Sequence, residues 1–149
     1  MTHDQVAQEV SLGAEKASPY RAIVARANYF AADRPDCQFA SKEVCRWMAN
    51  PTDLSLRGVK RQGRYLKGRK RLVYTYPWQT VSMVDVYSDT DWAGCVKTRK
   101  STSGGCTMLG QHLIKSWSST QSDISLSSGE AEFYGVVKAA GMGLGYGSL

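Results

Sequence analysis

Acidic residues gather at two places in the second half of the sequence. Asp85, Asp89 and Asp91 lie toward the end of a segment rich in Val and Tyr, and Glu130 and Glu132 lie at the start of an apolar one. Carboxylates grouped in this way can hold Mg2+, which prefers oxygen ligands and can activate water for phosphodiester cleavage. The simpler alternative is that the aspartates are polar loop groups and that the glutamates favour a helix N-terminus electrostatically.

Helical periodicity leaves the choice between the two glutamates open. Glu132 falls roughly 90° to one side of the expected apolar stripe, and Glu130 falls roughly 70° to the other. Either side chain can therefore turn toward the aspartates. Serine hydrolase chemistry is not expected, because the surrounding Ser127-Ser128-Gly129-Glu130 is not a Gly-x-Ser-x-Gly motif.

Basic residues gather in one stretch, because no acidic residue occurs between Ser55 and Val84. In a helix, several of them recur at i, i+3, i+7 and i+10 beside an apolar stripe, so that the cations flank the buried face and can follow a phosphate backbone. A solvated polar face is the alternative, and no base-reading motif accompanies the row, so sequence specificity is not implied. The stretch holds eight of the nineteen basic residues: Arg57, Lys60, Arg61, Arg64, Lys67, Arg69, Lys70 and Arg71.

Three short helices are predicted in the first half. Residues 1–17 are polar and indicate a leader or linker, and Ser18-Pro19 is a typical helix start. The first helix ends near Arg34, the second runs to about Met48, and the third runs from near Thr52 to Gly68. The stripe expected to face the core in the first helix consists of Tyr20, Ile23, Ala27 and Phe30, and that of the third consists of Leu56, Val59, Gly63 and Leu66.

Strands are predicted after residue 70, where the apolar period changes to two. Leu72–Tyr76 and Val81–Asp89 are rich in residues that favour strands. Gly105–Leu109 and His112–Ser118 are predicted to form a hairpin joined by Gly110-Gln111.

One more helix is predicted from Ser127, because Ser127-x-x-Glu130 fits a capping box. Its core stripe is expected to consist of Phe133, Val136, Val137 and Ala140. The glycines at alternate positions from Gly141 to Gly147 weaken the end of this helix, and they do not form a phosphate loop.

Composition narrows the class of protein without naming a function. The chain has 149 residues, a net charge of +6 and 42% apolar residues. It has no apolar run of membrane-spanning length and no secretory signal, so an intracellular protein without membrane contact is expected. The four cysteines lack zinc-site spacing and are expected to stay reduced, without disulfides.

The order of motifs resembles copia-type retrotransposon Pol polyproteins. Residues 18–71 resemble the connection segment after the polymerase active site of the reverse transcriptase, through Ser18-Pro-Tyr-Arg, Asn28-Tyr-Phe, Arg34-Pro-Asp36, Phe39-Ala, Asn50-Pro51 and Lys60-Arg-x-x-Arg-Tyr-Leu-Lys-Gly68. Residues 72–149 resemble the first part of the family's ribonuclease H domain, through Tyr87-Ser-Asp-Thr-Asp-Trp-Ala-Gly94, Thr98-Arg-Lys-Ser-Thr-Ser-Gly104, Ile114-Lys-Ser-Trp-Ser-Ser-Thr-Gln121 and Leu126-Ser-Ser-Gly-Glu-Ala-Glu-Phe-Tyr134. The fold this implies is α+β: a short helical segment followed by a partial ribonuclease H-like mixed sheet with one packed helix.

The resemblance also implies an activity and its limits. The family's complete domain cuts RNA in RNA·DNA hybrids with two Mg2+ ions, and the resemblance maps two of its catalytic metal ligands to Asp89 and Glu132. The two later aspartates of that site, and the paired aspartates of the polymerase, have no match in this sequence. The chain is therefore expected to be inactive alone, with weak or absent Mg2+ binding; a non-catalytic basic nucleic-acid-binding module and a degenerate open reading frame are the alternatives.

Overall fold

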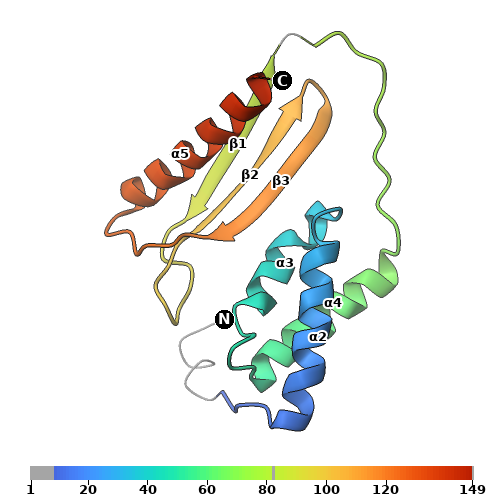
Figure 1. Ribbon diagram of the computed structural model, residues 1–149, viewed down its shortest axis with the longest axis vertical. Helices are drawn as coiled ribbons and strands as arrows, with labels where there is room; N and C mark the ends of the chain where they lie inside the picture. The colour runs from blue at the N-terminus through green and yellow to red at the C-terminus, as the bar shows by residue number, and fades with distance from the viewer. Residues whose placement is uncertain (1–8, 82, 149) are drawn as a thin grey trace. The chain divides into compact units, whose positions relative to one another are not determined.

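The computed structural model describes residues 9–81 and 83–148, and it divides into two compact units, one ending at Val73 and the other beginning at Tyr74 (Figure 1). The described part of the first unit contains three helices, α2 (Ala14–Phe30), α3 (Pro35–Cys45) and α4 (Asp53–Gly68). The second contains strands β1 (Val84–Asp91), β2 (Thr102–Leu109) and β3 (His112–Thr120), followed by α5 (Ser128–Gly147). The predicted α+β class is therefore confirmed.

The helical unit is organised around four buried side chains. Tyr20 and Val24 of α2 pack against Val44 and Trp47 from α3 and its C-terminal turn, and apolar residues of α4 close the cluster. The Tyr20 hydroxyl donates a hydrogen bond of 2.6 Å to the Val44 carbonyl, so the buried phenol is satisfied.

The start predicted for the first helix is wrong. The helix α2 begins at Ala14 with Gly13 as N-cap, so Pro19 lies inside the helix and residues 14–17 do not belong to a leader. Residues 14–17 are Ala, Glu, Lys and Ala, all strong helix formers, and Ala17 is buried. The helix propensity of these residues and the burial of Ala17 together offset the one backbone hydrogen bond that Pro19 removes. The rest of the predicted leader, residues 1–8, lies outside the described residues.

The core stripe of α2 is also corrected. The buried residues are Ala17, Tyr20 and Val24, whereas Ile23, which the predicted stripe contained, is 47% exposed. Ala17, Tyr20 and Val24 recur at i, i+3 and i+7, so they form one face of the helix, and the earlier helix start adds Ala17 to it. The helix α3 ends at Cys45, three residues before its predicted end.

The bounds of the third helix agree with their prediction, but its buried residues are Ser55 and Gln62, and Gly63 of the predicted core stripe is exposed. Thr52 is the N-cap of α4, and its side chain accepts a hydrogen bond from the Ser55 backbone N–H while the Ser55 hydroxyl accepts one from the Thr52 N–H. This reciprocal capping box satisfies two backbone donors at the helix start. The helix ends at Gly68, as predicted.

The sheet of the second unit has the order β1-β2-β3, and all its described pairings are antiparallel. The predicted hairpin is confirmed, since β2 and β3 are joined by Gly110 and Gln111, and Gly110 takes a positive φ of 57°. The mixed sheet implied by the family resemblance is not seen, because no parallel strand pair occurs among the described residues.

No strand forms at Leu72–Tyr76, which corrects that prediction. Residues 69–81 have no regular structure, and Val73 is 81% exposed. Strand propensity does not order a segment that finds no partner for its backbone groups. Within the second unit, the Gln79 side chain instead caps the β-turn: its amide donates to the Leu109 carbonyl at 2.7 Å, and its oxygen accepts from the Gln111 N–H at 3.0 Å.

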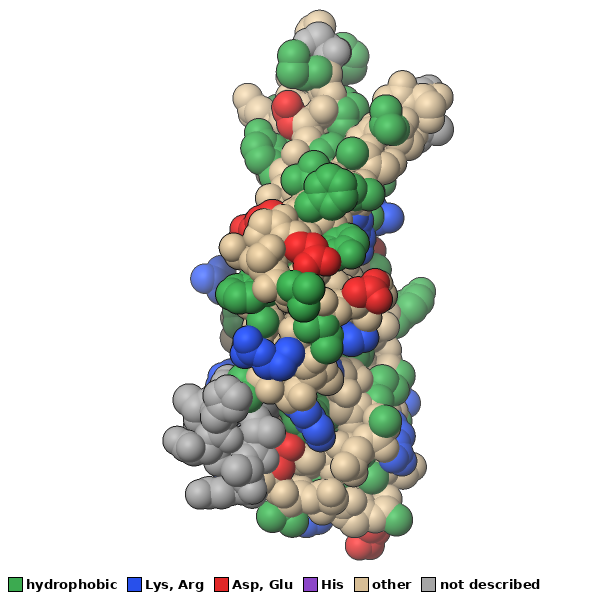
Figure 2. All heavy atoms as spheres, turned by 90° about the vertical axis from the view of Figure 1, so that its left-hand side faces the viewer, with side chains coloured by type: hydrophobic (Ala, Val, Ile, Leu, Met, Phe, Trp, Pro, Cys, Tyr) green, Lys and Arg blue, Asp and Glu red, His purple; other side chains and the backbone are tan. Residues whose placement is uncertain are grey.

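The buried face of α5 differs from the one predicted. Ala131, Gly135 and Ala139 face the sheet, whereas Phe133, Val136 and Val137 are more than half exposed. Close packing explains the difference, because a Cβ added at Gly135 would lie 2.5 Å from Thr90 Oγ1, so only small residues fit against β1. Figure 2, which views the molecule from the side of α5, shows hydrophobic side chains gathered there. The helix also continues through its glycines to Gly147.

Candidate nucleic-acid interface and acidic site

All eight basic residues predicted to bind nucleic acid are exposed. Five of them project from α4, whose buried side chains are Ser55 and Gln62. Arg57 and Arg64 lie roughly 160° around the helix axis from those two residues. These two cations therefore lie opposite the buried face, farther from it than predicted, whereas Arg61, roughly 100° from Gln62, flanks that face as predicted.

Little intramolecular charge opposes this surface. Arg57 forms an ion pair with Asp53, with Nη2 3.2 Å from Oδ2. Among the described residues, none of the other seven cations has an ion pair. An exposed row of like charges with one compensating carboxylate favours an anionic ligand.

The helix α4 is fixed in place by buried polar contacts with its neighbours. The Gln62 side-chain amide donates to the Ser41 hydroxyl at 2.7 Å, and that hydroxyl donates to the Ala27 carbonyl at 3.2 Å. Sequence reasoning missed this chain of contacts. The sequence did contain a hint of it, because Ser55 and Gln62 are polar residues seven positions apart and therefore lie on the same face of α4.

A second network lies at the C-terminal end of α4. The buried Arg34 guanidinium donates two hydrogen bonds to Asp36, at 2.9 and 2.7 Å, and one to the Arg69 carbonyl at 3.0 Å. The Tyr65 hydroxyl donates to Asp36 at 2.8 Å. The Arg34-Pro-Asp36 motif therefore has a structural role, because it secures the point where the chain leaves α4.

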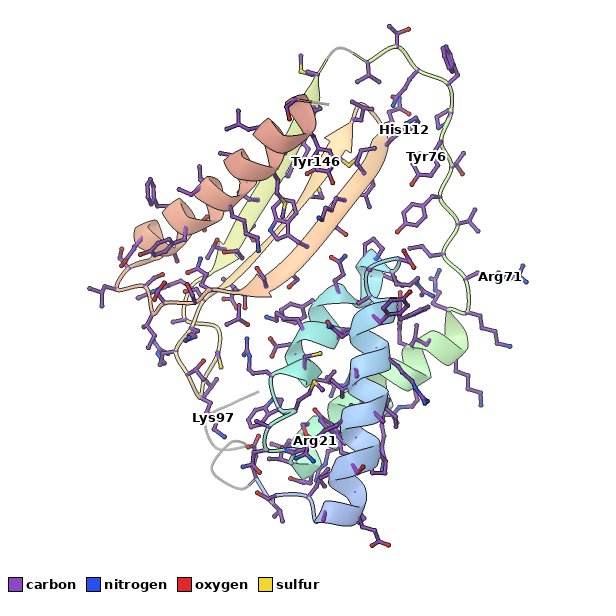
Figure 3. All side chains as sticks on the ribbon, in the orientation of Figure 1. Arg21, Arg71, Tyr76, Lys97, His112 and Tyr146 are labelled. Carbon is purple, nitrogen blue, oxygen red and sulfur yellow. The ribbon has the colours of Figure 1, made fainter. Side chains whose placement is uncertain are left out.

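The three basic residues after α4 lie in a segment without regular secondary structure. Arg69, Lys70 and Arg71 are exposed, and the Arg71 side chain projects away from its own backbone (Figure 3). Since the Arg69 carbonyl is held by Arg34, the start of this segment is anchored. The described chain thus continues the cationic surface of α4 beyond the helix.

The aspartates alternate with residues that face α5. Thr90 is buried against Gly135 of α5. Successive side chains of a strand point to opposite sheet faces, so Asp85, Asp89 and Asp91 belong to the other face of β1. Asp89 and Asp91 are exposed.

The structure distinguishes the two glutamates. The Glu130 carboxylate accepts a hydrogen bond of 2.7 Å from the Leu126 N–H, and its backbone N–H donates to the Ser127 hydroxyl at 3.1 Å. Glu130 is therefore occupied at the start of α5, but only half of the predicted capping box forms, because the Glu130 carboxylate binds the Leu126 N–H and not that of the N-cap Ser127. Glu132, one turn further into α5, is exposed, and no hydrogen bond or ion pair is formed by its carboxylate among the described residues.

The residues present do not fit a resident Mg2+ ion. No group of three or more His, Cys, Asp or Glu side chains that could hold a metal occurs within residues 9–81 and 83–148. Asp89 belongs to the sheet face opposite α5, while Glu132 lies on α5, so the two carboxylates do not lie on the same side of the sheet. Two exposed carboxylates leave most of an octahedral metal shell to water or substrate.

No disulfide joins any two of the four cysteines, all of which lie in the described residues, and burial raises the pKa of Cys37 and Cys45. Neither is therefore an activated thiolate. No described helix is long and apolar enough to cross a membrane.

Comparison with known proteins finds relatives along most of the chain. An uncharacterized mitochondrial protein of Arabidopsis thaliana is 40% identical over 118 residues, which cover 78% of this chain and 48% of that protein. The retrovirus-related Pol polyprotein from transposon RE1 of the same plant is 38% identical over 123 residues, covering 81% of this chain and 8% of the polyprotein. Secreted RxLR effector protein 161 of Plasmopara viticola is 30% identical over 122 residues, covering 81% of this chain and 86% of the effector.

The chain spans about half the length of the first of these relatives and under a tenth of the second. No protein-family model and no solved structure matches it.

Proposed function

The chain belongs to the copia-type family of retrotransposon Pol polyproteins, and from this premise we propose that it binds nucleic acid through the outer face of α4 without cleaving it. The single observation that carries the proposal is the row of exposed cations opposite the buried face of α4. The ligand class is an RNA·DNA hybrid or another nucleic acid, bound inside the cell through its phosphates.

The binding is expected to be electrostatic and independent of sequence. Lys and Arg side chains on one helical face can approach successive phosphates, and each neutralised phosphate releases counterions. No described element offers a recognised base-reading motif, so contacts to the backbone are expected to dominate.

Cleavage by the chain alone is not proposed. Metal-dependent phosphodiester cleavage needs ligands that fix the ions against the scissile phosphate. Asp89 and Glu132 are the residues that the family resemblance assigns to this role, and Glu132 is free of other hydrogen bonds among the described residues. Two exposed carboxylates do not supply that shell.

The binding proposal is tested by fluorescence anisotropy with a labelled RNA·DNA hybrid at several salt concentrations. The test variant is Lys60→Gln/Arg64→Gln, and its matched control is Lys16→Gln/Arg26→Gln, which removes one Lys and one Arg from exposed sites on α2. We expect the test variant to reduce the slope of log affinity against log salt by up to about 2 units, because each lost phosphate contact removes roughly 0.7–0.9. Equal slopes for the two variants would overturn the assignment to α4.

The absence of cleavage is tested with the same hybrid in the presence of Mg2+. The wild-type chain and an Asp89→Asn variant are expected to leave the hybrid intact to the same extent. Cleavage that disappears in Asp89→Asn would show that the missing ligands are supplied, for example by a second chain, and that the chain is catalytic.

A further inference from the structure

A hollow of about 230 Å³ lies beside the C-terminal end of β3. Ser103 of β2, residues 119–123, and Tyr134 and Lys138 of α5 line it. Most of these side chains carry hydroxyl groups, which can donate hydrogen bonds to an anion. Neither the cationic face of α4 nor the carboxylates of β1 contribute to this hollow.

Lys138 is the cation at this site. Its Nζ donates to the Ser119 hydroxyl at 2.6 Å, and no carboxylate forms an ion pair with it among the described residues. Burial, and then the positive charge of Lys115, lower the pKa of Lys138 below its ordinary value. A half-buried ammonium beside a second cation is stabilised when an anion binds.

Hydrogen bonds hold the floor of the hollow in place. The Gln121 side-chain amide donates to the Ser103 hydroxyl and to the Ala131 carbonyl, each at 2.9 Å, and its oxygen accepts from Ser125 at 3.0 Å. The Gln121 N–H donates to the Ser101 carbonyl at 2.9 Å. The hollow is therefore preorganised, which reduces the entropy lost when a ligand binds.

One carboxylate opposes an anion here. Asp123 lines the hollow, is exposed to solvent, and accepts a hydrogen bond of 2.6 Å from the Ser122 hydroxyl. Its exposure allows water and salt to screen its charge. Replacing Asp123 with a neutral residue should strengthen anion binding, whereas replacing Lys138 should weaken it.

We propose that this hollow binds a phosphate group. Lys138 supplies the charge, and the hydroxyls of Ser103 and Ser119, which accept hydrogen bonds from Gln121 and Lys138, keep their own protons as donors for the tetrahedral oxyanion. The Tyr134 hydroxyl, which also lines the hollow, donates to Glu130 at 3.4 Å. Several donors in three dimensions around one ammonium suit a phosphate better than a planar carboxylate. The phosphate can be free or can belong to the end of a nucleic-acid strand.

The proposal is tested by NMR titration of the full chain with inorganic phosphate at constant ionic strength. Saturable shifts are expected at the backbone amides of residues 119–123 and at Lys138. Lys138→Gln should weaken binding about tenfold, which corresponds to about 1.4 kcal/mol, while Lys138→Arg retains binding and Asp123→Asn strengthens it. Lys16→Gln, on the other unit, is the matched control for lost charge.

The two sources of phosphate are distinguished by a short oligonucleotide with and without a 5′-phosphate. Tighter binding of the phosphorylated form, lost in Lys138→Gln, indicates a strand end; equal binding of both forms, with inorganic phosphate still bound, indicates a free phosphate. No saturable shift at these residues, or the same affinity in wild type and Lys138→Gln, would overturn the proposal. Because Lys60→Gln/Arg64→Gln should leave phosphate binding unchanged, failure of this site and failure of the α4 interface can be told apart.

Discussion

Asp36 accepts three side-chain hydrogen bonds. Two come from Arg34, two residues away in sequence, and one comes from Tyr65 of α4. These hydrogen bonds lower the pKa of Asp36 from an ordinary value of 3.8 to about 2, and Arg34 has the largest effect. Burial acts in the opposite direction and raises the pKa. The folded state thus binds the proton of Asp36 less tightly than the unfolded chain does. A group of this kind stabilises the fold above its unfolded pKa and loses that contribution as the pH falls through the folded value.

We therefore expect the stability of the helical unit to fall between about pH 4 and pH 2, and Asp36→Asn to remove most of this dependence. At neutral pH, Asp36→Asn should lower the Tm by roughly 5 °C or more, because the Arg34 guanidinium loses its anionic partner. Thermal unfolding followed by circular dichroism across this pH range measures both effects. If the stability of Asp36→Asn still fell between about pH 4 and pH 2 as it does in the wild type, another carboxylate would be responsible for the acid dependence.

Glu130 and Glu132 give a second prediction at the residue scale. Glu130→Ala should destabilise the fold by about 0.5–2 kcal/mol, the range for lost helix-cap contacts, because the Leu126 N–H loses its acceptor. Glu132→Ala should stay within about 0.5 kcal/mol of wild type, since an exposed side chain without partners contributes little. Urea unfolding of the two variants checks the pair, and equal losses would show that Glu132 has a structural role.

Sequence pattern predicted the residues at this scale unevenly. The basic row and the Ser127 cap follow from local spacing, so both could be identified without a structure. The role of Arg34, Asp36 and Tyr65 depends on contacts between segments 29 residues apart, and the hydrogen bond of Glu130 to the Leu126 N–H, in place of the Ser127 N–H that a capping box requires, depends on the turn before α5. Neither is encoded in helical periodicity.

At the scale of elements, the orientation of α5 was the largest error of sequence reasoning. Periodicity placed the large apolar side chains in the core, because apolar residues usually face inward. The sheet approaches too closely for them at Gly135, where Thr90 Oγ1 occupies the space of a Cβ, so small residues face inward and large ones face out. Helix boundaries that depend on caps, such as those at Thr52 and Ser127, were predictable because the cap is a local interaction.

Gly135→Ala tests this packing. The added methyl group lies 2.5 Å from Thr90 Oγ1, so we expect a net loss of stability of about 1–2 kcal/mol, the cost of overpacking being reduced by the better helix propensity of alanine. Thr90→Ala should cost less, because the buried Thr90 hydroxyl has no hydrogen-bond partner among the described residues. In the double variant the loss at Gly135 should largely disappear, and a double-mutant cycle by urea unfolding measures that coupling. Additive effects would contradict direct contact.

At the scale of the whole molecule, the chain combines two units that differ in how well they bury apolar surface. The helical unit encloses Tyr20, Val24, Val44 and Trp47. The second unit leaves Phe133, Val137 and Leu144 of α5 at least half exposed, and β1 pairs with a neighbour on one side only among the described strands. Exposed apolar surface beside an unpaired strand edge favours association between chains.

We expect the purified chain to self-associate as its concentration rises, through α5 and the free edge of β1. Phe133, Val137 and Leu144 recur at i, i+4 and i+11, so they form one stripe that a second apolar surface can cover. Val137→Lys should reduce association without loss of fold, because Val137 is 53% exposed and a lysine there projects into solvent. Analytical ultracentrifugation measures the association, and circular dichroism checks the fold.

Val24→Lys is not a suitable control because it would unfold the core. The matched control is Ile23→Lys, which replaces an apolar residue of similar exposure in the helical unit. If Ile23→Lys reduced association as much as Val137→Lys, the contact surface would not be α5, and net charge alone would explain the effect.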